Sequence, residues 1–304
     1  MEKITPKNYF QHKEFLSYHD IKNFQKCEFL YSEDKAGKVE RVDRSYFLYG
    51  HAFDSLLTGD FSHNFVVGRD PKKSLEQLRT ARLKAEESRK KYEGRTDKRS
   101  QEALAKSIVA IQESEAKEMA LEDQTDKEAI TDTVYAHVEA SVQALDRQTL
   151  MSAFPRSAAT NQQIITTKIA GKAVKGMLDY FHRENSIIAD YKTTAQMKTF
   201  DPATYIGQLT WYRMLVREKF GIDCDCYLIV VDKETYTKHA KFVQISKETM
   251  DDHEQILLDA VERIKSAEAI GLYEPAAFEN IHGCFNCDHY GNCPHTVQTE
   301  FEVI

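Results

Sequence analysis

The sequence lacks several features that would each define a class of protein. No apolar run approaches the length of a membrane-spanning helix, and the first ten residues, MEKITPKNYF, lack the apolar centre of a signal peptide. No internal repeat or low-complexity segment is present. The chain has no Gly-x4-Gly-Lys-Ser/Thr phosphate-binding loop, which excludes a helicase motor of its own. We therefore expect a globular protein with a cytoplasmic location.

The composition is that of an ordinary globular chain, but its charge is unevenly spread. The 304 residues are 41% hydrophobic and 29% charged, enough for one large domain or for a core with an insertion. Residues 247–304 hold 3 basic and 12 acidic side chains, whereas residues 69–99 hold 12 Lys or Arg against 6 Asp or Glu. The net charge of −7 therefore does not exclude nucleic acid, because local patches govern contact with phosphates.

Hydrophobic periodicity and helix-boundary residues predict an α/β fold with a mixed central sheet flanked by helices. From about 72 to 149 nearly every residue favours a helix, and few are large and apolar, so residues 69–150 are expected to form a helical insertion. Cys224 and Cys226 fall on one face of a strand, where buried small side chains are the better interpretation. The other expected helices cover 16–31, 45–58, 202–219 and 247–270, and the expected strands cover 162–170, 173–181, 186–193, 225–232 and 238–245.

Two aspartates and a lysine fall on neighbouring predicted strands. They occur in Gly176-x-x-Asp179 and Asp190-x-Lys192, separated by the turn-forming residues 182–185. Strand alternation places Asp190 and Lys192 on one face, and a hairpin would bring Asp179 to them. Asp190 also follows an apolar run, where a charge is costly unless it is paired or binds a metal. The pattern suits a hard divalent cation and phosphodiester hydrolysis.

Taken with Gln208-x3-Tyr212 and an upstream Gly50-His51, these motifs resemble the PD-(D/E)XK nuclease superfamily. The closest resemblance is to the branch that contains RecB, AddB, RecE and the CRISPR adaptation nucleases. It covers about residues 10–58 and 160–295 and does not extend to the helical insertion. It implies a restriction-endonuclease-like core, with the whole chain, 1–304, forming a single nuclease domain.

The resemblance also implies a metal site for Mg²⁺ or Mn²⁺. Its ligands would be His51, Asp179, Asp190 and the backbone carbonyl of Tyr191. A single histidine on a helix is more often a surface or core residue than a ligand, and only the surrounding motif favours His51 as one.

Further roles follow from the same resemblance. Lys192 would orient or deprotonate the attacking water and stabilise the charged transition state, although a structural ion pair would place it in the same spot. Gln208 would position the lysine or a metal-bound water, and Tyr212 would contact DNA. Thr193 and Thr194 would donate to phosphate oxygens, or would simply favour the strand.

A second signal comes from the cysteines near the C-terminus. Cys284-x2-Cys287-x5-Cys293 supplies three thiolates, which need a fourth ligand. A nearby histidine would complete a zinc knuckle. The candidates are His282, His289 and His295.

Alternatively, Cys27 would close a four-cysteine site for a [4Fe–4S] cluster. The spacing and the helix around Cys27 resemble those of AddB and the CRISPR adaptation nucleases, which favours the iron–sulfur cluster over zinc. Such a cluster, formed by residue 27 and residues 284–293, would join the two ends of the chain.

These features together predict a metal-dependent DNA exonuclease of the RecB/RecE type that processes DNA ends for recombination or repair. It would serve a phage or mobile element beside a single-strand annealing or recombination protein, with its oligomeric state left open. One alternative is a CRISPR-adaptation-like nuclease that trims DNA ends. Another is a non-catalytic DNA-binding iron–sulfur scaffold in a helicase–nuclease assembly, against which the intact Asp/Asp/Lys set argues.

Overall fold

The computed structural model describes residues 3–6, 8–38, 45–122, 124–155, 159–233 and 240–274. The chain divides into two compact units. The first comprises Met1–Arg44, Leu145–Glu234 and Lys238–Ile304, and the second comprises Ser45–Ala144 with Thr235–Thr237.

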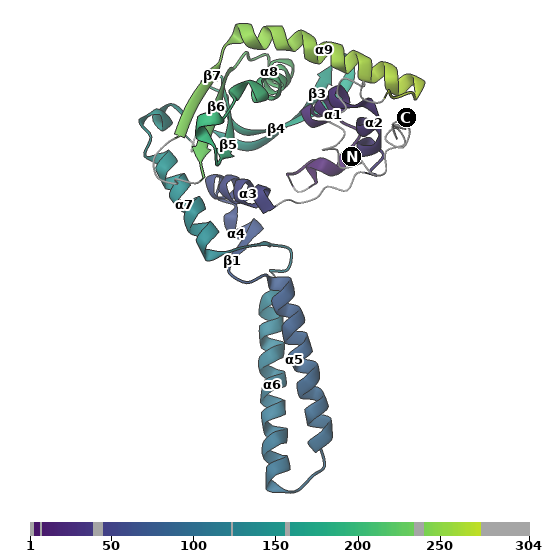
Figure 1. The fold of residues 1–304 in the computed structure, drawn as a ribbon, viewed down its shortest axis with the longest axis vertical. Helices are drawn as coiled ribbons and strands as arrows, with labels where there is room; N and C mark the ends of the chain where they lie inside the picture. Colours follow the sequence, from purple (N-terminus) through teal and green to yellow (C-terminus); the bar gives the residue numbers. More distant parts are fainter. Residues whose placement is uncertain are drawn as a thin grey trace, which may run out of the picture. The chain divides into compact units, whose positions relative to one another are not determined.

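A five-stranded mixed sheet forms the centre of the first unit (Figure 1). Its spatial order follows the chain, β3-β4-β5-β6-β7, and only the β5–β6 pair is parallel. This sheet and its helices confirm the predicted mixed α/β fold. The strands are β3 (Thr160–Ile169), β4 (Lys172–His182), β5 (Ile187–Thr194), β6 (Asp225–Asp232) and β7 (Ala240–Ile245).

Helices cover the sheet in layers (Figure 1). α8 (Ile206–Phe220) packs on β3 to β6, and α9 (Lys247–Ile270) packs on α8 and on α1 (Tyr18–Lys26). The core between them includes Trp211, which is fully buried and whose indole donates to the Lys175 carbonyl at 3.2 Å. Cys224 and Cys226 are both buried, as predicted.

The boundaries of α8 follow from local chemistry. The Asp201 side chain accepts from the Ala203 N–H at 2.9 Å, which caps a 3-10 turn over Pro202–Tyr205 rather than the α-helix itself. The helix ends at Gly221, whose φ of 70° a side chain would disfavour.

The single helix predicted over 16–31 is wrong, because the chain forms two helices there. α1 begins with a reciprocal capping box between Ser17 and Asp20. It ends at Cys27, whose backbone is extended (φ −166°, ψ 118°), and α2 (Glu28–Lys35) follows directly. Cys27 therefore lies at the junction of the two helices.

The second unit is largely helical, and two short strands, β1 (Phe65–Val67) and β2 (Glu128–Ile130), form a parallel pair within it. The sequence did not predict these strands. α5 and α6 form an antiparallel hairpin (Figure 1). No described helix is both long and apolar enough to cross a membrane. The helices of this part of the chain are α3 (Ser45–Thr58), α4 (Phe61–Asn64), α5 (Pro71–Tyr92), α6 (Lys98–Glu122) and α7 (Asp132–Asp146).

Candidate active site

The two aspartates lie where β4 and β5 separate. Pairing between these strands runs from His182 opposite Ile187 to Tyr180 opposite Ala189 and stops there, so Asp179 and Asp190 are the first residues beyond it. β5 continues to pair with β6 as far as Thr194. The two carboxylates therefore lie at parting strands, with no strand ladder between them.

The backbone is also irregular on the other side of Asp179. In the β3–β4 register the residue opposite Asp179 is Gln162, which has a left-handed φ of 48°. Such a conformation is uncommon outside glycine, and it interrupts the regular strand next to Asp179. The Asp179 side chain in turn accepts from the Tyr191 N–H at 3.0 Å, which fixes one of its oxygens toward β5.

Asp190 is buried, with 1% of its surface exposed, and it is held from two directions. Lys192 Nζ lies 2.5 Å from one carboxylate oxygen, as expected for two residues on the same face of a strand. Gln208 Nε2 donates to the other oxygen at 3.0 Å. The same Gln208 amide nitrogen also donates to the Tyr212 hydroxyl at 2.8 Å, so α8 contributes directly to the site.

Gly176 explains how α8 comes so close. A Cβ atom at this position would lie 2.4 Å from Leu215 Cδ1 and 3.4 Å from two ring carbons of Tyr212. The glycine in Gly176-x-x-Asp179 therefore lets the helix rest on β4 and brings Gln208 within reach of Asp190.

The electrostatics of Lys192 favour the ammonium form. Burial lowers its pKa, but the carboxylates of Asp190 and Asp179 outweigh burial and raise the pKa above its ordinary value. Burial, reinforced by the same two aspartates, raises the pKa of Tyr212 as well. Both groups are therefore protonated at neutral pH.

Sequence reasoning missed Tyr205. Lys192 Nζ lies over its ring, 5.1 Å from the centroid, and the ring is stacked on Phe200 with centroids 5.5 Å apart and planes at 10°. No local pattern identifies this contact, because it depends on how the chain between β5 and α8 folds back over the lysine.

The donor set fits a hard divalent cation that keeps several waters. Oδ2 of Asp190 is fully buried and, among the described residues, accepts no hydrogen bond of regular geometry, its neighbour being the Lys192 ammonium. Mg²⁺ is commonly bound through one or two carboxylates together with waters, and Asp179 and Asp190 supply two. The described residues contain no cluster of three or more His, Cys, Asp or Glu side chains suited to a metal.

The roles of the other predicted site residues stay predictions. His51 lies in α3 of the second unit, and its role as a ligand stays a prediction, as does that of the Tyr191 carbonyl. Thr193 and Thr194 end β5, where the Thr194 hydroxyl accepts from the Gln196 N–H at 3.0 Å. Their contact with phosphate also stays a prediction. Cys284, Cys287, Cys293, His282, His289 and His295 lie outside the described residues.

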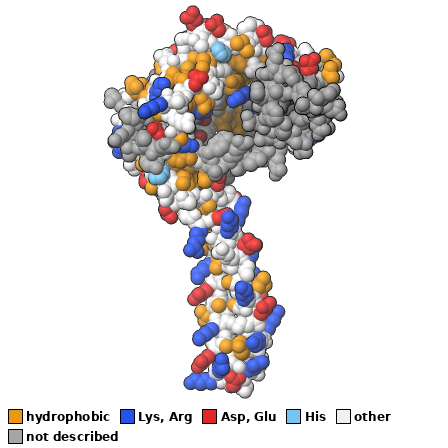
Figure 2. Space-filling model, in the orientation of Figure 1, with side chains coloured by type: hydrophobic (Ala, Val, Ile, Leu, Met, Phe, Trp, Pro, Cys, Tyr) orange, Lys and Arg blue, Asp and Glu red, His pale blue; other side chains and the backbone are white. Residues whose placement is uncertain are grey.

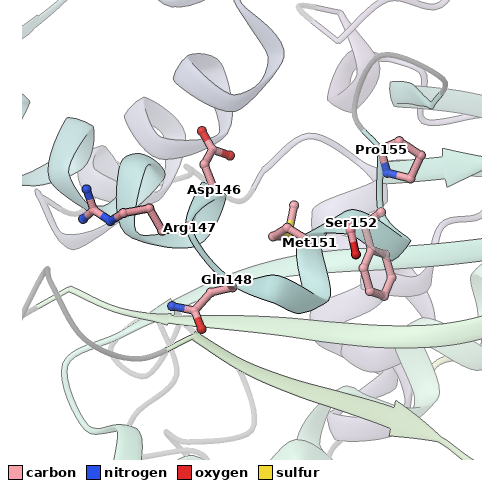
Figure 3. A pocket seen from close by; sticks show the side chains of 7 residues that line it. Asp146, Arg147, Gln148, Met151, Ser152 and Pro155 are labelled. Carbon is pink, nitrogen blue, oxygen red and sulfur yellow. The ribbon is translucent and has the colours of Figure 1, made fainter.

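A separate pocket of about 510 Å³ lies in the first unit (Figure 3). Asp146, Arg147 and Gln148 line one part of it, and Met151 and Ser152 line another. It contains none of the carboxylate-site residues, and we assign it no part in the chemistry.

The arrangement found here is typical of PDDEXK-like proteins. It consists of a mixed sheet, two carboxylates where two strands separate, and a lysine two residues after the second carboxylate. The family described as "PDDEXK-like domain of unknown function (DUF3799)" matches residues 17–284, and the chain belongs to it. This confirms the predicted superfamily and supports a nuclease. The resemblance to the iron–sulfur branch is not part of that match.

A solved structure shares the fold. A candidate exonuclease from Eubacterium rectale superimposes with a TM-score of 0.61 at 14% sequence identity, covering 99% of this chain and 95% of that one. The protein SSO0001 gives a TM-score of only 0.32 at 16% identity, covering 82% of this chain and 96% of that one, which is too low to indicate a shared fold. No curated protein matches the chain in sequence.

Proposed function

We propose that the protein is a Mg²⁺- or Mn²⁺-dependent deoxyribonuclease that processes DNA ends as an exonuclease, for recombination or repair. The observation that carries this proposal is Asp190, buried between Lys192 and Gln208 at the point where β4 and β5 separate beside Asp179. Burying a carboxylate costs folding free energy, and a role in metal binding would explain why the protein keeps Asp190 buried at this position.

Each residue has a distinct task in this proposal. Asp179 and Asp190 would hold the metal, which supplies an activated water and charge neutralisation. Lys192, as an ammonium, would donate to a phosphate oxygen and stabilise the negative charge that develops there. Gln208 keeps Asp190 oriented, and Tyr212 holds the glutamine in turn. A direct contact of Tyr212 with DNA is less favoured, since the residue is 9% exposed.

Exonuclease action is favoured by the name of the Eubacterium rectale protein that shares the fold. Digestion of 5′- and 3′-labelled duplex and single-stranded DNA, with Mg²⁺ and with EDTA, tests it. Mononucleotide or short-oligonucleotide release from one labelled end, only with metal, is the expected result. Cleavage of covalently closed circles would contradict exonuclease action, and trimming that stops after a few nucleotides would favour the CRISPR-adaptation-like alternative. DNA binding without any cleavage would favour the scaffold alternative.

Replacing Gln208 with Ala is expected to lower the rate of cleavage about 10-fold to 100-fold, because Asp190 loses the group that fixes its orientation. Steady-state cleavage at saturating Mg²⁺ measures the effect. The matched control is Lys219→Ala, at an exposed position near the end of the same helix. If the two variants cleave at equal rates, Gln208 has only a structural role and the prediction is wrong.

We also propose that Cys27 joins Cys284, Cys287 and Cys293 around a [4Fe–4S] cluster, with zinc as the alternative. The described chain end supports this pairing of distant segments. The Glu274 carbonyl accepts from the Phe29 N–H at 3.3 Å, and the Glu28 carboxylate accepts from the Glu274 N–H at 3.1 Å. Residue 274 therefore lies beside Cys27, and Cys284 follows ten residues later. The Cys27 side chain also lies at the N-terminus of α2, on the same end of that helix as Glu28.

Cys27→Ala is expected to remove the brown colour, the iron and the acid-labile sulfide of anaerobically purified protein, and to lower its thermal stability. Cys224→Ala is the matched control, because that thiol is buried in the core of the first unit. Colourless wild-type protein with one equivalent of zinc, retained after Cys27→Ala, would instead support the local knuckle with one of the three histidines.

A further inference from the structure

The connection between α5 and α6 carries a cluster of exposed cations. We call residues 89–99 the hairpin tip. Figure 2 shows Lys and Arg side chains at this end of the hairpin. The hairpin tip holds six basic residues, all exposed, against two acidic ones: Arg89, Lys90, Lys91, Arg95, Lys98 and Arg99, with Glu93 and Asp97.

The opposite end of the same hairpin treats its cations differently. Arg82 Nε lies 3.2 Å from Glu118, and Arg79 Nη2 lies 3.2 Å from Glu122, so α6 neutralises the arginines of α5 there. Within the described part of the chain, no basic residue of the hairpin tip has a carboxylate within 4.0 Å. The charge of the hairpin tip is therefore available to a partner.

The helix dipole explains the positions of only half of these six cations. Arg89, Lys90 and Lys91 lie in the last turn of α5, where cations favourably oppose the helix dipole. Lys98 and Arg99 are the first residues of α6, where the dipole disfavours cations. They occupy this position although it is electrostatically unfavourable for the helix they begin.

The Tyr92 ring contacts two cations of the hairpin tip without neutralising them. Lys91 Nζ lies over the Tyr92 ring, 5.6 Å from its centroid, and the Arg95 guanidinium lies 5.7 Å from it. A cation–π contact orders a side chain while its positive charge remains.

We propose that the hairpin tip binds the phosphate backbone of duplex DNA and adds sequence-independent affinity to the nuclease. This inference rests on the proposed function, since it requires that DNA is the substrate. Duplex DNA is the partner because it is the proposed substrate and carries one negative charge per about 1.7 Å of helix axis, which several neighbouring cations can contact at once.

The test compares two variants that lose the same charge. Lys98→Gln/Arg99→Gln removes two cations from the hairpin tip, and Arg79→Gln/Arg82→Gln removes two ion-paired cations from the other end. Binding of a fluorescent duplex in EDTA is measured by anisotropy over a range of salt concentrations. The hairpin-tip variant should weaken binding at least about 5-fold at low salt, and the slope of log K against log salt should fall by about 0.9 for each phosphate that the protein no longer neutralises.

Thermal denaturation separates this role from a structural one. The hairpin-tip variant should melt at the wild-type temperature or above, because it removes cations from a helix N-terminus. The control variant should melt lower and bind DNA almost as wild type does. Unchanged affinity and salt slope in the hairpin-tip variant would overturn the inference, as would equal weakening in both variants.

The two proposals can fail separately. If the wild-type enzyme cuts DNA and the hairpin-tip variant binds DNA as tightly as wild type, the proposed nuclease function is supported. The proposed DNA-binding role of the hairpin tip is then wrong. A wild-type protein that binds duplex through the hairpin tip but cuts no DNA with Mg²⁺ or Mn²⁺ would keep this inference and overturn the proposed function.

Discussion

Asp190→Asn is expected to lower Mg²⁺-dependent DNA cleavage by at least about 100-fold while leaving the protein folded. The change keeps an oxygen that can accept from Gln208 Nε2, removes the negative charge and turns an amide NH2 toward the Lys192 ammonium, which is partly exposed and still has the Asp179 carboxylate nearby. A hard divalent cation loses one of its two carboxylates, whereas the hydrogen bond that ties β5 to α8 survives. Cleavage of end-labelled duplex measures the loss, and circular dichroism checks the fold.

The matched control is Asp225→Asn, on the adjacent strand β6. Asp225 is partly exposed and lies 3.4 Å from Lys247, at the opposite end of β5 from Lys192. The Asp225→Asn variant should cut DNA at the wild-type rate. If the Asp190 variant retained near-wild-type turnover, the assignment of the metal site to these strands would be wrong.

Lys192 requires a gentler change than alanine. Deleting the ammonium would leave Asp190 buried without its cation, which costs about 3–5 kcal/mol when a buried pair is broken. Lys192→Gln keeps a donor for the carboxylate and removes the charge. It should lower cleavage as strongly as Asp190→Asn does but weaken duplex affinity in EDTA only slightly, as the loss of one phosphate contact predicts, so that a large loss of both would point to unfolding.

The contacts between site residues that are close together in the sequence could be predicted from the sequence. Strand alternation brings Lys192 to Asp190, and the turn before β5 brings Asp179 back toward them. The predicted helix over 45–58 and the strand over 225–232 match α3 and β6 residue for residue. In each of these segments local propensity and burial favour the same structure.

The remainder depends on contacts between distant segments. Nothing in the sequence around Tyr205 indicates that its ring lies under Lys192, and only the family resemblance connects Gln208 to Asp190. The interpretation that places Ile256 on the buried face of α9 is wrong, since 52% of it is exposed, whereas Leu257 and Ile264 are buried. The break at Cys27 is hidden by a helical pattern that continues across it.

Gly176→Ala is expected to destabilise the protein by about 1–3 kcal/mol and to lower cleavage even where the protein remains folded. The added methyl group would lie 2.4 Å from Leu215 Cδ1, and Leu215 is fully buried in a close-packed core. The expected response is a shift of Leu215 and, with it, of α8 away from β4. Because Gln208 is on that helix, its amide would no longer reach Asp190.

A double substitution separates this steric explanation from a general intolerance of alanine at the position. Leu215→Ala alone should cost about 2–5 kcal/mol through the cavity it leaves. In that background Gly176→Ala should cost little or even stabilise, because the new methyl group enters the space that the leucine side chain vacates, so the two free energies of unfolding will not add. Urea denaturation of the four proteins measures the coupling. If the two costs add, Gly176 does not set the distance between α8 and the sheet. The proposal that this glycine positions Gln208 against Asp190 would then be wrong.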